Sequence, residues 1–363
     1  MFLAIVVFIL VLGLLIFVHE LGHFVLAKKA GIKIEEFGFG FPPRIFGIRK
    51  GETLYSLNLF PLGGFVKIYG EIRKEGKDPL RKRAFYSQSA LTRAGILVAG
   101  VTMNIVLAGL LLGLGHFIGL PALIDDSQAD NLDSVKVQIL QVAFDSPAEQ
   151  AKLKTGDTIS ELRYEDESIS ISTVRQVQSF VNLHKGEEIT LIAQRGDQVL
   201  EKQIVPREDH PEQEGPLGIS LARTAIVSYP WYEAIVRGFI SAFTLTWAIM
   251  VAFSGILWQL MTSGHLAVEI AGPVGIFDLT NQAAQLGFIY VLQFTAILSI
   301  NLAILNALPI PALDGGRLLF LIIEKIKGSP ISQKVERISQ LVGFSLLILV
   351  MIAITWRDIA RMF

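Results

Sequence analysis

The chain has 363 residues, no cysteine and a formal net charge of −1 at pH 7. Its hydrophobic content of 52% and its mean hydropathy of +0.51 exceed what the core of a soluble protein needs. The absence of cysteine excludes disulfides and thiolate metal sites, and the composition favours a membrane protein.

Apolar stretches recur along the chain, and each is long enough to cross a bilayer, which takes about 20 helical residues. They cover residues 1–27, 95–119, 234–262, 288–308 and 339–356. The first predicts a helix from about Phe2 to Ala30 that ends before Gly31. Residues 125–224 are polar throughout, so we expect them to lie in water.

The segment after the first helix is rich in β-forming residues. "TLYSLNLF" and "GFVKIYG", which are joined through Pro61, Gly63 and Gly64, are typical of two strands in a hairpin. Both faces of the segment are apolar, which predicts that it dips into the membrane or packs on the helices.

The charges are sorted along the chain. Residues 28–93 hold 14 Lys and Arg against 6 Asp and Glu, whereas residues 121–228 hold 10 against 19. The positive-inside tendency then places the first loop in the cytoplasm and the polar region on the opposite side of the membrane.

The polar region alternates short strands with one or two helices, which predicts a small α+β domain. "SPAEQAKLKTGDTI" resembles the helix and Gly-Asp segment of bacterial PDZ domains, with Lys152 where glycine is usual. "GPLGI" resembles their carboxylate-binding loop, displaced to the end of the domain as in circularly permuted versions. The resemblance implies that a peptide C-terminus is bound at Leu217, Gly218 and Ile219, by backbone N–H groups and strand addition. A spacer domain that binds nothing is the alternative.

The pattern H-E-x-x-H occupies residues 19–23, at the end of a run without polar side chains. On a helix, His19 and His23 lie one turn apart on one face, so their imidazoles can bind one Zn²⁺. Glu20 then lies beside the metal, where it can accept a proton from water. Structural histidines are the alternative, but a charged residue at the centre of a span costs about 2.5–3.5 kcal/mol. Three ionisable groups in five residues therefore favour a metal site.

A catalytic zinc usually has three protein ligands and one open position. The other histidines are scattered, so we expect a carboxylate as the third ligand. Asp314 in "NALPIPALDGG" is the best candidate, because prolines break the helix before it and two glycines follow it. Glu269 and Asp278 are rivals with weaker context. For Asp314 to meet His19, both segments must enter the membrane from one side. The apolar segment 231–262 must then lie along the interface, re-enter, or cross with a mate.

Together, these motifs resemble the site-2 protease family of intramembrane zinc metalloproteases, in the branch of the bacterial regulator of sigma-E protease. The likeness rests on HELGH in the first span and on "FGFGF", "PLGGFVKI", "AGPVGI", "NLAILNALPIPALDGGR" and "RDIARMF". It implies Zn²⁺ bound by His19, His23 and Asp314, with Glu20 as general base. It departs from some members of the branch in having room for one PDZ domain rather than a tandem pair.

The same resemblance implies residues that contact a substrate. These are two asparagines of a late span and the "PLGGFVKI" strand, which would pair with an unwound substrate. The residues concerned are Asn301, Asn306, Gly63, Gly64, Phe65, Val66 and Lys67.

The predicted fold is a polytopic α-helical membrane protein with about four transmembrane helices and a membrane-associated β-hairpin. A PDZ-like α+β domain at residues 128–224 is inserted on the extracytoplasmic side, between the protease-core halves 1–120 and 225–363. We expect a multi-pass protein of the bacterial inner membrane with its active site toward the cytoplasm.

The predicted function is hydrolysis of a peptide bond within or near the transmembrane segment of a single-span protein, such as an anti-sigma factor or a remnant signal peptide. The expected partners are these substrates and the lipid bilayer, and no nucleic acid. A metal-binding transporter is the alternative, since broken helices with polar residues also occur in transporters. A non-catalytic scaffold would leave the buried ionisable groups unexplained.

Overall fold

The structure is a computed structural model that describes residues 2–71, 79–124, 135–196, 198–211, 214–263 and 272–360. It contains two compact units. Unit 1 comprises Met1–Leu114, Ile235–Gln282 and Val291–Phe363, and unit 2 comprises Gly115–Ala234 and Ala283–Tyr290. Unit 2 therefore extends beyond the predicted range 128–224 on both sides and takes in a short later segment.

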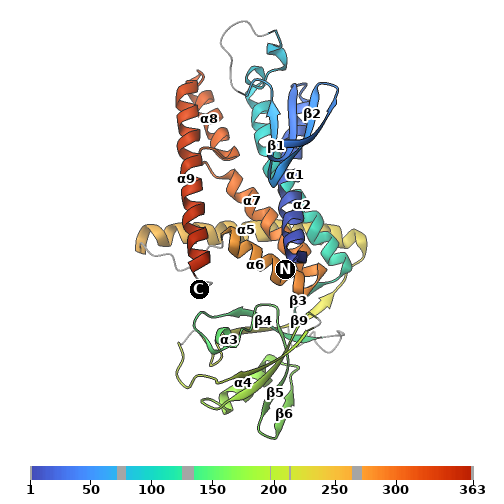
Figure 1. Cartoon of the computed structure of the whole chain (residues 1–363), viewed down its shortest axis with the longest axis vertical. Coiled ribbons are helices and arrows are strands. Elements are labelled where there is room, and N and C mark those ends of the chain that lie inside the picture. Colours follow the sequence, from blue (N-terminus) through green and yellow to red (C-terminus); the bar gives the residue numbers. More distant parts are fainter. Residues whose placement is uncertain are drawn as a thin grey trace. The chain divides into compact units, whose positions relative to one another are not determined.

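Unit 1 is built mainly from helices (Figure 1). They are α1 (Phe2–Lys29), α2 (Ala90–Ile118), α5 (Trp231–Ser263), α6 (Pro273–Leu286), α7 (Phe288–Ala307), α8 (Asp314–Lys327) and α9 (Gln333–Ala360). Within the described part of the chain, five helices are long and apolar enough to cross a membrane, namely α1, α2, α5, α7 and α9. The chain thus has the helices of a polytopic membrane protein, as its composition predicts.

The colours of Figure 1 show in which direction each long helix runs. Helices α1 and α7 run one way, whereas α2 and α9 run the other way. Helix α5 is continuous through Ser254 and Gly255, so the segment does not fold back on itself. It runs across the other long helices and crosses α2 where Gly238 lies against the backbone of Gly109 and Gly113. Glycines at such a crossing let two helix backbones approach closely.

A small antiparallel sheet follows α1. It consists of β1 (Ile34–Lys50) and β2 (Thr53–Ile68), joined by a turn at Gly51, whose φ is +63°. Residues 36–39 of β1 pair with residues 54–57 on one edge and with residues 64–67 on the other. The predicted hairpin between "TLYSLNLF" and "GFVKIYG" is therefore wrong. Both segments belong to β2, and β1 lies between them because it satisfies the backbone groups of both.

The two ends of this sheet have different surroundings. Ile34 and Ile68 are buried in a hydrophobic cluster with residues of α1, α2 and α8. Residues 41–50 are exposed, although they include Phe41, Ile45 and Phe46. The sheet is thus anchored on the helices at one end and presents an apolar surface at the other.

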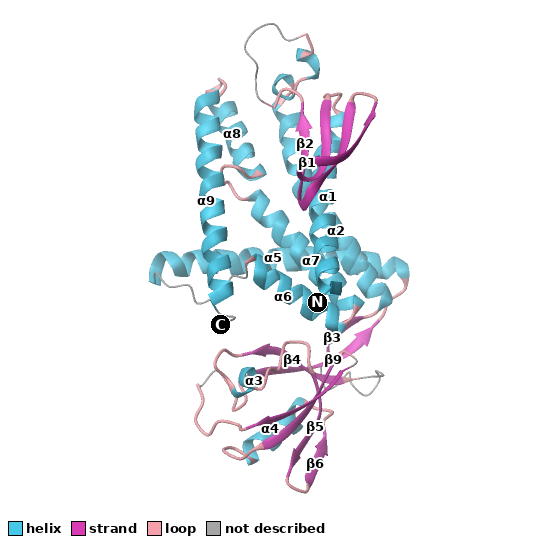
Figure 2. Ribbon diagram, viewed as in Figure 1, coloured by secondary structure: helices cyan, strands magenta, loops and turns pink. Residues whose placement is uncertain are grey.

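Unit 2 contains a second, separate sheet (Figure 2). The strand order is β3-β9-β4-β5-β7-β8, with β6 paired to β5. The strands are β3 (Leu120–Leu123), β4 (Lys136–Val142), β5 (Thr158–Tyr164), β6 (Glu167–Ser170), β7 (Ile189–Arg195), β8 (Gln198–Ile204) and β9 (Ile219–Val227). Helices α3 (Pro147–Gln150) and α4 (Val174–Leu183) complete the α+β unit.

The local signals of unit 2 explain these elements. Thr173 and Gln176 form a capping box at the start of α4, which satisfies backbone N–H groups of its first turn. Val177, Phe180 and Val181 of α4 are buried in the same hydrophobic cluster as residues of β4, β5 and β7. The predicted helix "STVRQVQSFVNLH" and the two strands after it are confirmed.

Candidate active site

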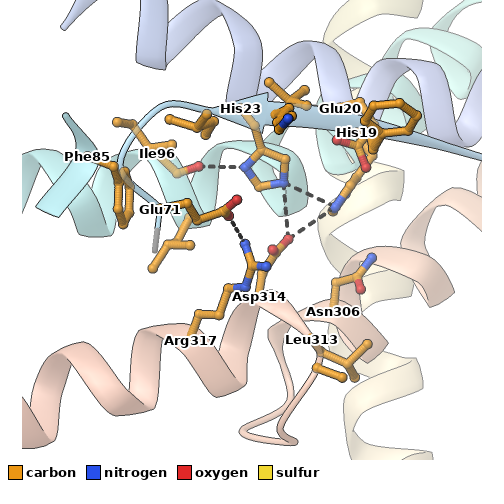
Figure 3. Close-up of a pocket in the computed structure, with 16 residues that line it drawn as sticks. His19, Glu20, His23, Glu71, Phe85, Ile96, Asn306, Leu313, Asp314 and Arg317 are labelled. Carbon is orange, nitrogen blue, oxygen red and sulfur yellow. Dashed lines mark hydrogen bonds and ion pairs between the residues drawn. The ribbon is translucent and has the colours of Figure 1, made fainter. Parts of the chain in front are cut away.

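Three side chains from distant parts of the sequence meet in unit 1 (Figure 3). The Oδ2 atom of Asp314 lies 3.1 Å from Nε2 of His19 and 3.2 Å from Nε2 of His23, and the two Nε2 atoms are 3.3 Å apart. Among the described residues, this is the one group of three or more metal-ligand side chains whose ligand atoms converge. Both histidines are buried.

The hydrogen bonds around His23 test whether a cation fits here. Its Nδ1 lies 2.8 Å from the backbone oxygen of Ile96, which can only accept, so a neutral ring carries its proton on Nδ1. Its Nε2 then presents a lone pair to Asp314, whose buried Oδ2 receives no hydrogen bond among the described residues. A cation between these atoms removes the repulsion. Two imidazole nitrogens and one carboxylate oxygen match the ligands of catalytic Zn²⁺.

The backbone before Asp314 explains its position. The chain leaves α7 at Ala307, Ala312 adopts a left-handed φ of +80°, and Asp314 is the first residue of α8. A Cβ atom at Gly315 or Gly316 would collide with carbonyl groups of this loop. The two glycines therefore let the loop close tightly beneath the carboxylate, as the sequence pattern predicts.

Of the two rival ligands, Asp278 is not part of this group. Asp278 lies on α6, where its Oδ2 accepts a hydrogen bond from Gln282, 2.8 Å away. Glu269 lies outside the described residues.

A cavity of about 410 Å³ opens beside the three ligand candidates. Glu20 lines it, one residue after His19, and so do four consecutive residues of β2, from Phe65 to Ile68. Because side chains of a strand alternate between its faces, four consecutive lining residues mean that the strand presents its edge. In the described part of the chain, residues 64–68 pair only with β1, so this edge is open.

Only some of the predicted substrate-contact residues line the cavity. A Cβ at Gly64 would meet Ile16 and Glu20, so Gly64 packs β2 against α1, whereas Gly63 packs against the ring of Phe41. Asn306 lines the cavity, but Asn301, five residues earlier on α7, is not among the lining residues. The structure thus brings Asn306, Phe65, Val66 and Lys67 to the cavity and leaves Gly63 and Asn301 away from it.

An ion pair that sequence analysis did not identify also lines the cavity. Arg317 of α8 binds Glu71, which follows β2, and Figure 3 shows the pair on one side of Asp314 and Asn306 on the other. Burial alone would lower the pKa of Arg317, but the negative charges of Glu71 and Asp314 outweigh it and raise the pKa above its usual range. Arg317 therefore stays charged.

Helix α2 supplies the second group of residues that sequence analysis missed. The backbone oxygen of Ile96 binds His23, and the amide of Asn104 lies 3.4 Å from Nδ1 of His19. A buried asparagine in an apolar helix is itself a signal, since polar groups inside a membrane span are costly without a partner.

Buried H-E-x-x-H histidines, a carboxylate that converges on them and an adjacent Glu beside an open strand edge are the arrangement of a zinc-dependent peptidase. Comparison with known proteins agrees. The model of peptidase family M50 matches residues 7–350, and the chain belongs to this family. It is a zinc metalloprotease of the site-2 type.

Curated relatives cover nearly the whole chain. Zinc metalloprotease RasP of Oceanobacillus iheyensis is 32% identical, with 99% of this chain and 99% of the relative covered. Regulator of sigma-W protease RasP of Bacillus subtilis is 30% identical over the same shares of both chains. None of this supports the alternative of a metal-binding transporter.

Proposed function

We propose that the protein is an intramembrane endopeptidase that hydrolyses a peptide bond within or near the transmembrane segment of single-span membrane proteins. One observation carries the proposal: the open edge of β2 lies along the same cavity as Glu20 and the three ligand candidates. An anti-sigma factor or a remnant signal peptide is a substrate of the expected kind, and the name of the Bacillus relative refers to regulation of a sigma factor.

The proposed roles follow from the contacts. His19, His23 and Asp314 hold Zn²⁺, which supplies the Lewis acidity that polarises a carbonyl and lowers the pKa of water to about 7. Glu20 is the general base: its carboxylate accepts the proton of the attacking water and passes it to the leaving amine.

The strand edge addresses the main obstacle for such a substrate. A transmembrane helix satisfies every backbone C=O internally, so its scissile bond is accessible only after local unwinding. Strand addition along Phe65, Val66 and Lys67 would replace the lost hydrogen bonds. The amide of Asn306 lines the same cavity and is placed to bind the unwound backbone.

We further propose that four helices cross the membrane and that α5 lies along its surface. The parallel course of α1 and α7, and the crosswise course of α5, support this arrangement. Trp231, Trp247 and Trp258 of α5 are exposed, as is typical of aromatic residues at a membrane interface. The basic loop 28–93 then lies in the cytoplasm, with the active site toward that side of a bacterial inner membrane.

Unit 2 is proposed to be a PDZ-like domain outside the cytoplasm. Residues 219–223 of β9 pair with β4 on one edge, and β3 covers only residues 224–227 on the other. Helix α4 contacts β9. A peptide C-terminus can add as a strand beside β9, with its carboxylate at Leu217, Gly218 and Ile219.

Glu20→Gln tests the proposal. We expect cleavage of a tagged single-span protein in membranes to fall by about 10²- to 10⁴-fold, the usual contribution of a general base, while zinc content stays at one per chain. Unchanged cleavage by the Gln variant would refute the proposed mechanism.

A further inference from the structure

Helix α2 presents three residues, each one turn from the next, to the two histidines. Ile96, Gly100 and Asn104 are spaced by four and lie on one helix face. A Cβ atom at Gly100 would collide with the rings of both His19 and His23. The rings thus lie directly against α2, and their outer nitrogen atoms meet the residues one turn to either side of Gly100.

The two histidines differ in what faces these outer nitrogens. Nδ1 of His23 faces a backbone carbonyl, that of Ile96, which fixes the proton on Nδ1 and the lone pair on Nε2. Nδ1 of His19 faces the side-chain amide of Asn104, whose nitrogen is 3.4 Å away. An amide can donate or accept, so the identity of the facing atom decides which nitrogen of His19 carries the proton.

The role of His19 as a proposed metal ligand decides which amide atom of Asn104 faces it. Asn104 is fully buried, and its Oδ1 has no hydrogen-bond partner among the described residues. A half-turn of the amide exchanges its oxygen and nitrogen without moving other atoms, and such orientations are assigned from the hydrogen bonds they allow. After this half-turn, Oδ1 accepts the Nδ1–H of His19, and the amide nitrogen takes the position without a partner. The two orientations therefore leave one amide atom unsatisfied each, but only this one fits a His19 that carries its proton on Nδ1 and keeps the lone pair of Nε2 for a metal.

We propose that Asn104 is a positioning residue for the metal centre. Its Oδ1 accepts from Nδ1–H of His19, and this hydrogen bond holds the tautomer whose Nε2 lone pair points toward Asp314. The hydroxyl of Ser299 on α7 donates to the backbone oxygen of Asn104, 2.8 Å away, and fixes the asparagine in place. The inference rests on the proposed zinc site and gives each histidine an outer acceptor on α2, as metal-bound histidines usually have.

The test compares two variants of similar size, Asn104→Asp and Asn104→Leu. The carboxylate of Asp keeps an acceptor for Nδ1–H, whereas Leu has none. We expect the Leu variant to bind Zn²⁺ about 10- to 100-fold more weakly than the native protein and the Asp variant to bind within about threefold of it or more tightly. The affinity is measured on the detergent-purified full chain by competition with a chelator, and the Co²⁺ absorption spectrum reports ligand geometry.

If Asn104 only fills space, the Asp variant should be the more damaged of the two. The reason is that a buried carboxylate costs more than a buried Leu when nothing binds it. Equal zinc affinities of the Leu variant and the native protein, or an Asp variant as weak as the Leu variant, would overturn the inference. Thermal unfolding of the metal-free variants separates loss of folding from loss of metal binding.

Two further variants complete the test. Thr295→Val on α7 removes a buried hydroxyl that donates only within its own helix, to the backbone oxygen of Val291, and we expect native zinc affinity. His23→Ala should lose zinc. If it retains zinc, the proposed metal site itself is wrong; if it loses zinc while the Leu variant keeps native affinity, only the role of Asn104 is wrong.

Discussion

Asp157 in unit 2 is fully buried and Asp314 in unit 1 is largely buried, but the surroundings of the two carboxylates are opposite. The carboxylate of Asp157 is completely buried and receives two hydrogen bonds of 2.7 Å from Arg195 and one of 2.9 Å from the backbone N–H of Lys154. Asp314 instead faces two imidazole nitrogens. A buried carboxylate with its own donors stabilises the fold, whereas one that faces acceptors needs a cation.

Removal of the Asp314 carboxylate should have the largest effect. We expect Asp314→Ala to weaken zinc binding by more than 100-fold, beyond the 10- to 100-fold cost of losing an outer-shell partner, and to abolish cleavage of a single-span substrate. Metal content after dialysis and cleavage in membranes measure the two effects. Asp278→Ala is the matched control, and a variant at Asp314 that keeps one zinc per chain would place the third ligand elsewhere.

Replacement of Asp157 by Ala should lower the stability of unit 2 and leave the zinc in place. Breaking a buried ion pair by removing one partner costs about 3 kcal/mol, so Asp157→Ala should unfold at a lower urea concentration with zinc content unchanged. Urea-dependent proteolysis of unit 2 in the full chain measures this. Glu161→Ala, which breaks the exposed pair with Arg163, is the control and should leave the urea concentration of unfolding nearly unchanged. A loss of zinc in the Asp157 variant would contradict the distinction between the two carboxylates.

Local spacing made part of the site predictable. His19 and His23 follow from the 3.6-residue period of one helix, and Asp314 from the break that Pro and Gly impose before α8. Asn104 and Ile96 were not predictable in their roles, because these depend on how α2 packs against α1. The resemblance did not distinguish Asn301 from Asn306, and of the two only Asn306 lines the cavity.

The fold was likewise predictable where local sequence decides it and not where long-range pairing does. Apolar length predicted the five long helices, and β-rich composition predicted the segments of β2 and the strands β7 and β8, but it did not single out β1 or β9. The pairing within the small sheet was wrong because composition does not specify which strand lies between two others, and the long-range register in β1 and β2 decides it.

The carboxylate of Glu71 is intermediate between those of Asp157 and Asp314. It has an arginine partner, as Asp157 does, but this partner, Arg317, lines the cavity, and both side chains are about one-third exposed. The pair ties the end of β2 to α8 and so holds the strand edge beside Asp314. A partly exposed pair contributes about 0.5–1 kcal/mol, so Glu71→Gln should raise KM about two- to fivefold without loss of zinc. Kinetics on a single-span substrate in micelles measure it, with Glu52→Gln, which breaks the pair with Arg83 outside the cavity, as control. An unchanged KM would show that the pair does not position the strand.

The smallest effect concerns the loop that precedes Asp157. Lys152 is exposed and has a left-handed φ of +61°, at the position where the resemblance to PDZ domains leads one to expect glycine. A side chain in this region costs about 1 kcal/mol, and glycine removes the strain but makes the unfolded chain more flexible. Lys152→Gly should therefore stabilise unit 2 by a few tenths of a kcal/mol up to about 1 kcal/mol. Lys185→Gly, at a position without a positive φ, should destabilise it instead.

Because the backbone oxygen of Lys152 accepts a hydrogen bond from Arg195, 3.0 Å away, relief of this strain leaves the partner of Asp157 in place. The gain should then persist in the Asp157→Ala background, and its disappearance there would mean that the loop and the ion pair are coupled.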